Sequence, residues 1–263
     1  MTLTDDRIAQ LAEALYRARK SGAPIEPLTA DHPDMTVTDA YRVQQGLVKR
    51  LLADGDAVVG YKLGLTSEPM QRLLGVDSPD FAPVLASHVH QDGAQIAASW
   101  FIRPRIEAEI ALVLSEDLSG PGCAEADAAK AVGGARPAIE IVDSRIRDWK
   151  IKLADTVADL ASSGAIVLGD RVHPIPGGFD LRLVGMAFSR GARLVATGAG
   201  AAALGSPLVA VAWLANTLHE VGDSLRAGQF VMTGALHAAL DIGPGQDFRA
   251  EFDHLGSVTA RII

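Results

Sequence analysis

Two glutamates lie inside an apolar stretch, "RPRIEAEIALVL", at residues 103–114. If the stretch is a strand, side chains two positions apart point the same way, so Glu107 and Glu109 share one face with Arg105. The other face is then apolar and consists of Ile106, Ala108, Ile110, Leu112 and Leu114. Burying an ionised carboxylate without a partner costs several kcal/mol. Either the glutamate face is solvated, or a positive group holds both acids.

A third glutamate has the same setting. Glu140 lies in "PAIEIVDSR", residues 137–145, between Ile139 and Ile141. Three glutamates on short apolar strands suggest one oxygen-lined site for Mg²⁺ or Mn²⁺, because these ions prefer carboxylate oxygens. The chain has no His and Cys cluster, which argues against zinc. Alternation alone also fits glutamates that face solvent on half-exposed antiparallel strands, and the pattern does not choose between these two interpretations.

A lysine in "GYKLGLTS", residues 60–67, is the next candidate. Lys62 lies between Gly60 and Gly64, and glycines permit a close approach of the backbone to a ligand. A buried lysine beside a small anion could stabilise charge or move a proton. The alternative is a lysine on an edge strand without a role in chemistry.

Other segments carry weaker signals. "DTVADLASSGAIVLGD", residues 155–170, places Asp159 and Ser162 ahead of an apolar strand, where they could also simply cap a turn. "VATGAGAAALGSPLVAVAWL" runs from glycines into a helix, but its glycine spacing does not match the dinucleotide pattern G-x-G-x-x-G. His237 could contact a ligand or pack under a loop.

The composition predicts a globular cytoplasmic protein. Of 263 residues, 48% are hydrophobic and 21% are charged, which excludes a disordered chain. The net charge of −8 argues against nucleic-acid binding. Cys123 is the only cysteine, so no intrachain disulfide can form. The N-terminus lacks the features of a signal peptide, and the apolar run "PLVAVAWLANTL" is too short to span a bilayer, so we expect no membrane contact.

The predicted elements divide the chain in two. Apolar spacing predicts helices over 4–20 and over 38–56, the second capped by Thr38, and we expect residues 1–57 to form a helical N-terminal subdomain. Residues 58–263 are expected to form a strand-rich catalytic body, with helices near 68–74, 123–132 and 207–221. Strands are predicted at 58–65, 106–114, 137–142, 165–168, 181–188, 192–197, 229–233, 248–252 and 257–262. Helices and strands do not alternate regularly, so the fold class is α+β with a mixed sheet.

Together these segments resemble the 2-keto-4-pentenoate hydratase family, within the fumarylacetoacetate hydrolase superfamily. The resemblance runs over nearly the whole chain and is carried by "GYKLGLTS", "SPDFAPVL", "PRIEAEIALVL", "PAIEIVDSRIRDWKIKLADTVADLASSGAIVLGD", "TGAGAAALGSPLVAVAWLANTL" and "LGSVTARII". It implies the C-terminal fold of the fumarylacetoacetate hydrolases and a homo-oligomer, a pentamer or a decamer. It also implies that Glu107, Glu109 and Glu140 bind Mg²⁺ or Mn²⁺, and that Lys62 and Asp80 are acid–base or electrostatic residues.

The chain departs from the family pattern at two positions near the expected site. The family often has Asp-Asn-Ala-Ser where this chain has Asp159, Leu160, Ala161 and Ser162, and often has Gly at Ala82. Leucine cannot replace the hydrogen bonds of an amide. If that amide contacts substrate, the substrate or the rate differs here; if it is structural, little changes. We further expect Asp159, Ser162 and Thr233 to bind substrate.

The resemblance implies a hydratase of 2-hydroxypenta-2,4-dienoate in the catabolism of aromatic compounds by meta cleavage. One alternative is the sister activity, 4-oxalocrotonate decarboxylase. Another is a hydratase of a longer dicarboxylate, which needs an additional cation for which the sequence offers no clear candidate. A third is a non-catalytic oligomeric partner of a pathway enzyme. A hydratase of this kind could also associate with a downstream aldolase or with the sister decarboxylase.

Overall fold

Two sheets form the body of the protein. The structure is a computed structural model that describes residues 2–67, 71–72 and 75–263. The larger sheet has the order β2 (Asp80–Leu85), β1 (Val58–Gly64), β10 (Phe230–Ala235), β5 (Arg105–Leu114), β6 (Val132–Val142), β7 (Ser163–Leu168) and β3 (Val89–Gln91), and β11 (Leu240–Asp241) also pairs with β5. The smaller sheet has the order β4 (Ala94–Ile96), β13 (Gly256–Ile262), β12 (Gln246–Phe252), β8 (Gly185–Arg190) and β9 (Arg193–Ala199). Parallel and antiparallel pairs occur in both sheets, which confirms the mixed α+β class.

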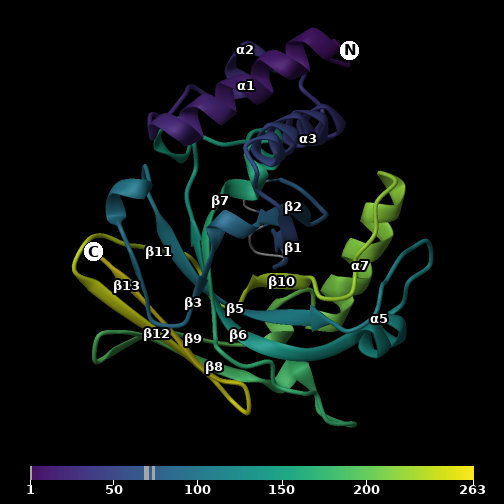
Figure 1. Cartoon of the computed structure of the whole chain (residues 1–263), viewed down its shortest axis with the longest axis vertical. Coiled ribbons are helices and arrows are strands. Elements are labelled where there is room, and N and C mark those ends of the chain that lie inside the picture. Colours follow the sequence, from purple (N-terminus) through teal and green to yellow (C-terminus); the bar gives the residue numbers. More distant parts are fainter. Residues whose placement is uncertain (1, 68–70, 73–74) are drawn as a thin grey trace.

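Helices flank these sheets at the N-terminus and at one side (Figure 1). Their bounds are α1 (Asp5–Ser21), α2 (Leu28–Asp31), α3 (Val37–Ala53), α5 (Glu125–Ala131), α6 (Leu153–Ala158) and α7 (Pro207–Glu220). The N-cap of α3 is Thr36 rather than Thr38, because Thr36 and Asp39 exchange hydrogen bonds in a capping box. The helix expected near 68–74 lies mostly outside the described residues.

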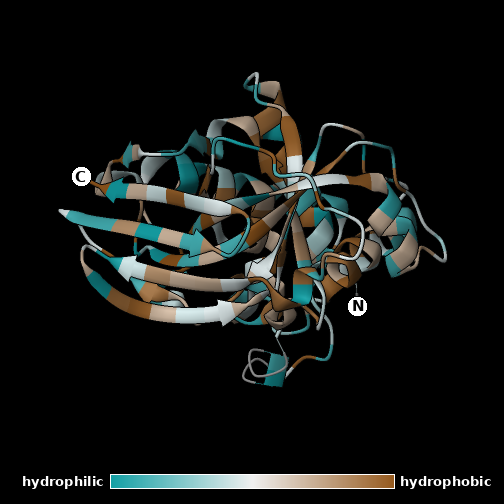
Figure 2. Ribbon diagram, turned by 90° about the horizontal axis from the view of Figure 1, so that it is seen from below, coloured by the Kyte–Doolittle hydropathy of each residue, from teal (hydrophilic) through white to brown (hydrophobic). Residues whose placement is uncertain are grey.

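The main core lies between the two sheets. The apolar face of β5 packs there together with Phe248 and Ala250 of β12 and Val258 and Ala260 of β13. Polar and apolar residues alternate along β12 and β13 because one face of each strand meets this core and the other meets solvent (Figure 2). With this face of β5 occupied by core, Glu107 and Glu109 must point to the opposite side of the larger sheet.

The N-terminal helices pack on the part of the body that surrounds residue 160. Buried residues of α1 and α3 form one hydrophobic cluster with body residues Ala82, Leu85, Ile146, Val157, Leu160 and Ala161. Gln44 of α3 donates hydrogen bonds to the carbonyls of Phe81 and Val157 at 3.0 and 2.7 Å. The last helix of this part ends at Ala53, close to the expected boundary at residue 57. The division into 1–57 and 58–263 stays a prediction, since the two parts share this cluster.

One helical stretch is long and apolar enough to cross a membrane by length and composition. It runs from Gly200 to Glu220, and half of it is buried inside the protein. Its α7 portion places Ala210, Leu214 and Leu218 in the main core. The apolar character of this helix is therefore explained by its packing in the protein.

Candidate metal centre and active site

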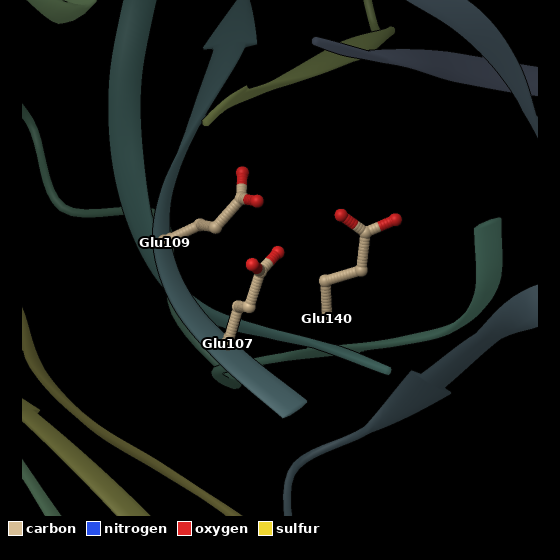
Figure 3. A group of neighbouring side chains, drawn as sticks. All are labelled: Glu107, Glu109 and Glu140. Carbon is tan, nitrogen blue, oxygen red and sulfur yellow. The ribbon is translucent and has the colours of Figure 1, made fainter. Parts of the chain in front are cut away.

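Three glutamates from two neighbouring strands converge on one point (Figure 3). Antiparallel pairing of β5 and β6 sets Glu107 directly opposite Glu140 and Glu109 opposite Ala138. Directly opposed residues project from the same face, so all three side chains extend to the same side of the sheet. One carboxylate oxygen from each lies within 4.8 Å of those of the other two.

One ion pair, between Lys62 and Glu140, brings positive charge to this group of three carboxylates. Burial, together with Glu140, raises the pKa of Glu107 to about 7. Burial and the other two glutamates raise the pKa of Glu109 well above its ordinary value. Neither oxygen of Glu140 accepts a well-aligned hydrogen bond from the described residues, although Lys62 Nζ lies 3.0 Å from its Oε1. Buried oxygen donors without partners fit a hard divalent cation such as Mg²⁺ or Mn²⁺.

Lys62 is buried beside this group. It extends from β1, and its Nζ donates to the carbonyl oxygen of Ala161 at 2.8 Å and forms the ion pair with Glu140. Burial alone would lower the pKa of Lys62, but Glu140, Asp80, Glu109 and Glu107 outweigh it and the pKa is raised. The lysine is therefore charged. It is not the edge-strand residue of the alternative interpretation, because β1 lies between β2 and β10.

Asp80 begins β2, opposite Gly64 of β1. A Cβ atom at residue 64 would overlap Asp80 Oδ1, so only glycine leaves room for this carboxylate against the backbone. Burial raises the pKa of Asp80 to about 6, with Lys62 opposing the shift and Glu140 adding to it. Oδ1 has no hydrogen-bond partner among the described residues. Asp80 is thus a buried carboxylate with a pKa close to neutrality, as acid–base residues often have.

An unusual turn supplies the carbonyl that receives Lys62. Leu160, Ala161 and Ser162 all have left-handed φ values, of 55°, 48° and 56°. Each residue other than glycine costs about 1–2 kcal/mol of conformational energy in the left-handed conformation. The turn places the Ser162 hydroxyl 3.1 Å from that of Thr156, and both residues line the site.

Two residues expected to bind substrate lie elsewhere. Asp159 is fully buried, and its Oδ1 accepts from Arg145 Nε at 2.7 Å; it is not part of the cavity lining. Thr233 is also outside the lining, and its hydroxyl donates to the carbonyl oxygen of Ile110 at 2.9 Å. The adjacent Gly234 N–H donates to Glu109 Oε2 at 2.9 Å. Asp159 and Thr233 contact neighbours of the site and Ser162 is part of the cavity lining; substrate binding by these three residues stays a prediction.

A cavity of about 600 Å³ is lined by Lys62, Asp80, Glu107 and Glu109, whereas Glu140 lies outside this lining. Besides Lys62, Asp80, Glu107 and Glu109, its polar lining includes Thr156, Arg105 and His237. The N–H of Ala108 donates to His237 Nε2 at 3.0 Å, and the ring stacks on Phe188 at a centroid distance of 4.9 Å. His237 therefore both lines the cavity and packs on the core. Thr156 has no signal in the sequence, whereas Arg105 was marked by its place on the glutamate face.

Comparison with known proteins identifies the family of this chain. The model of the fumarylacetoacetate (FAA) hydrolase C-terminal family matches residues 63–263. The chain is 46% identical to the 2-keto-4-pentenoate hydratase of Paraburkholderia xenovorans, over 97% of this chain and 95% of that one. It is 41% identical to the 2-hydroxyhexa-2,4-dienoate hydratase of Comamonas testosteroni, over 93% of each.

A solved structure extends the similarity to the whole fold. The 4-oxalocrotonate decarboxylase of Pseudomonas putida G7, complexed with magnesium and adipate, superposes with a TM-score of 0.96 at 39% identity, over 100% of this chain and 99% of that one. The matched family model, these relatives and the glutamate centre confirm the resemblance seen in the motifs. The chain belongs to the fumarylacetoacetate hydrolase family, in the group that contains the 2-keto-4-pentenoate hydratases.

Proposed function

We propose that this protein is a metal-dependent hydro-lyase that adds water to 2-hydroxypenta-2,4-dienoate and gives 4-hydroxy-2-oxopentanoate, in the meta-cleavage catabolism of aromatic compounds. The observation that carries the proposal is the glutamate trio beside Lys62, with Glu109 and Glu140 buried, in a chain 46% identical to a named hydratase. Glu107, Glu109 and Glu140 would hold Mg²⁺ or Mn²⁺. An ion bound there supplies Lewis-acid stabilisation of negative charge on a substrate oxygen.

Residues of the chain then accept protons and bind the substrate. The enol loses its O2 proton while C5 gains one, which leaves an α,β-unsaturated ketone with an electrophilic C4. Water adds its hydroxyl to C4 and a proton goes to C3, so atoms balance. Asp80, with its pKa raised to about 6, accepts the proton of the attacking water. Lys62 donates one N–H to the carbonyl oxygen of Ala161 and forms an ion pair with Glu140, and a further N–H of its ammonium group would be donated to the substrate carboxylate.

Loss of dienol absorbance, with and without a chelator, tests this proposal. Glu107→Gln should abolish metal-dependent turnover while leaving the fold intact, because the amide keeps the shape of the side chain and loses its charge. The exposed Glu116→Gln is the matched control and should retain turnover. A Glu107→Gln protein with near-wild-type turnover refutes the ligand assignment.

The sister reaction is the second candidate, because the decarboxylase structure covers the entire chain. Release of carbon dioxide from 2-oxohex-3-enedioate, measured beside hydration of the dienol, separates the two activities. We also propose a cytoplasmic homo-oligomer, a pentamer or decamer, that associates with a downstream aldolase or a sister decarboxylase. Sedimentation of the pure protein measures its oligomeric state, and sedimentation of mixtures measures its association with the other enzymes.

A further inference from the structure

The peptide between Glu107 and Glu109 has an unusual hydrogen-bond partner. Both glutamates extend from β5 (Figure 3), and the residue between them, Ala108, is fully buried. The N–H of Ala108 donates to Nε2 of the His237 imidazole at 3.0 Å. A side chain thus takes the place that a backbone carbonyl normally takes in a sheet. The proposed reaction assigns no role to this histidine.

The imidazole is needed there because the neighbouring chain turns away from β5. Strand β10 pairs with β5 as far as Glu109, and β11 resumes the pairing at Ile106. Between them, Leu236 donates its N–H to the carbonyl oxygen of Ala108 at 3.0 Å. In a regular pair Ala108 would return a hydrogen bond to the carbonyl oxygen of Leu236. That carbonyl lies instead against Gly198 of β9, where a Cβ atom would overlap it.

The His237 ring is fixed in the orientation that this bond requires. Its Nδ1 lies 2.7 Å from the carbonyl oxygen of Ala238. A carbonyl can only accept, so the hydrogen is assigned to Nδ1 and Nε2 is the acceptor. The ring stacks on Phe188 of β8 at a centroid distance of 4.9 Å, and Phe188 stacks on Phe248 of β12 at 5.7 Å. The backbone and the main core therefore hold the acceptor in place together.

We infer that His237 is a positioning residue of the metal centre, whose ring holds the Ala108 peptide and thereby sets the spacing of the carboxylates of Glu107 and Glu109. The inference rests on the proposed function, in which these carboxylates hold the ion. A buried N–H without an acceptor is costly, so β5 relaxes between the two glutamates when the ring is lost. Loss of a partner that orients metal ligands typically lowers metal affinity about 10- to 100-fold.

Two divalent cations respond differently to such a relaxation. Mg²⁺ requires near-ideal octahedral geometry at about 2.0–2.1 Å, whereas Ca²⁺ accepts flexible geometry at about 2.3–2.6 Å. A shift of β5 at Ala108 should therefore weaken the binding of Mg²⁺ more than the binding of Ca²⁺. A loss of protein stability that leaves the spacing of the carboxylates unchanged would not alter the ratio of the two affinities.

Calorimetric titration of the full-length protein with Mg²⁺ and, separately, with Ca²⁺ tests the inference without turnover. His237→Phe keeps an aromatic ring on Phe188 but removes the acceptor of the Ala108 N–H. We expect its Mg²⁺ affinity to fall about 10-fold and its Ca²⁺ affinity to fall less than about 3-fold. His237→Gln should keep the wild-type affinities, because the amide oxygen of glutamine can take the place of Nε2.

His219→Phe is the matched control. His219 is an exposed residue of α7 outside the cavity lining, so the same substitution there should leave both metal affinities unchanged. If His237→Phe does not fold, His237→Asn provides the second test. The amide of asparagine ends closer to the main chain than Nε2 does and cannot reach the Ala108 N–H, so the same selective loss of Mg²⁺ affinity is expected.

The outcomes separate this inference from the proposed function. A folded His237→Phe protein with wild-type Mg²⁺ affinity overturns the role of His237 and leaves the hydratase proposal standing. An equal loss of affinity for both ions does the same, and so does a loss that also occurs in His237→Gln. A wild-type protein that binds neither ion overturns both proposals, because the glutamates would then hold no metal.

Discussion

Replacing Gly64 with alanine tests how Asp80 is positioned. The new Cβ would come closer to Asp80 Oδ1 than the 3.0 Å that Cβ atoms essentially never cross, so the carboxylate must retreat. A retreat of roughly 1 Å is enough to cost about 100-fold in rate when the displaced group takes part in the reaction. The backbone of residue 64 is not left-handed, so the alanine itself adds no backbone strain. We expect kcat/KM to fall about 100-fold.

Three further measurements test whether Gly64→Ala lowers kcat/KM by displacing Asp80. Metal affinity, followed by calorimetry, should be unchanged, because the glutamates lie on β5 and β6 and do not touch the new methyl group. The control Gly185→Ala, where a Cβ would meet nothing within 4 Å, should keep full turnover. Asp80→Ala and the double variant should lose equal activity, since the methyl group acts only through Asp80. A folded, metal-binding Gly64→Ala protein with wild-type kcat/KM refutes the role of Asp80.

Three further predictions concern charge. Glu109→Gln should abolish the thermal stabilisation by Mg²⁺, which for the wild type is about 2.7 kcal/mol at 100 times Kd, while Glu116→Gln retains it. Lys62→Met should destabilise the metal-free protein by about 3–5 kcal/mol in urea unfolding, because Glu140 loses its buried partner; an unchanged midpoint contradicts the ion pair. Burial, then Arg19 and Arg145, lowers the pKa of His88 to about 3. The unfolded state then binds more protons below pH 6.5, so stability is present above that pH and lost as pH falls. Between pH 7 and pH 5, the free energy of unfolding of His88→Gln should fall by up to about 2 kcal/mol less than that of the wild type. Unfolding experiments at each pH measure this difference.

The glutamate centre could be predicted because strand alternation is a local property. Glu107 and Glu109 share a face with Arg105 in any strand, and the apolar partners of Glu140 mark a second strand of the same kind. What the pattern could not supply was register, since only the pairing of β5 with β6 brings Glu107 opposite Glu140. The position of Lys62 beside the glutamates likewise depends on the pairing of β1 with β10, which the sequence pattern does not supply.

The structure of the segment around residue 160 could not be predicted from local sequence patterns. Helix α6 is only six residues long and most of it is buried, so it has no amphipathic period to detect. The left-handed turn contains neither glycine nor asparagine, which are the usual signals for that conformation. Asp159 was expected to bind substrate; in the structure its carboxylate accepts hydrogen bonds from Arg145 and the residue lies outside the cavity lining, which the local sequence does not indicate. The strand β2 was missed because Pro83 interrupts its pattern.

The left-handed turn gives the N-terminal helices an influence on the reaction without touching the cavity. Leu160 is buried in the hydrophobic cluster that includes α1 and α3. The carbonyl oxygen of the next residue, Ala161, accepts a hydrogen bond from the ammonium group of Lys62. Without this packing, residues 160–162 would relax toward ordinary backbone angles, and Lys62 would lose its hydrogen bond to the carbonyl oxygen of Ala161. Substitutions in the helices packed on Leu160 are therefore expected to act on Lys62 through this turn.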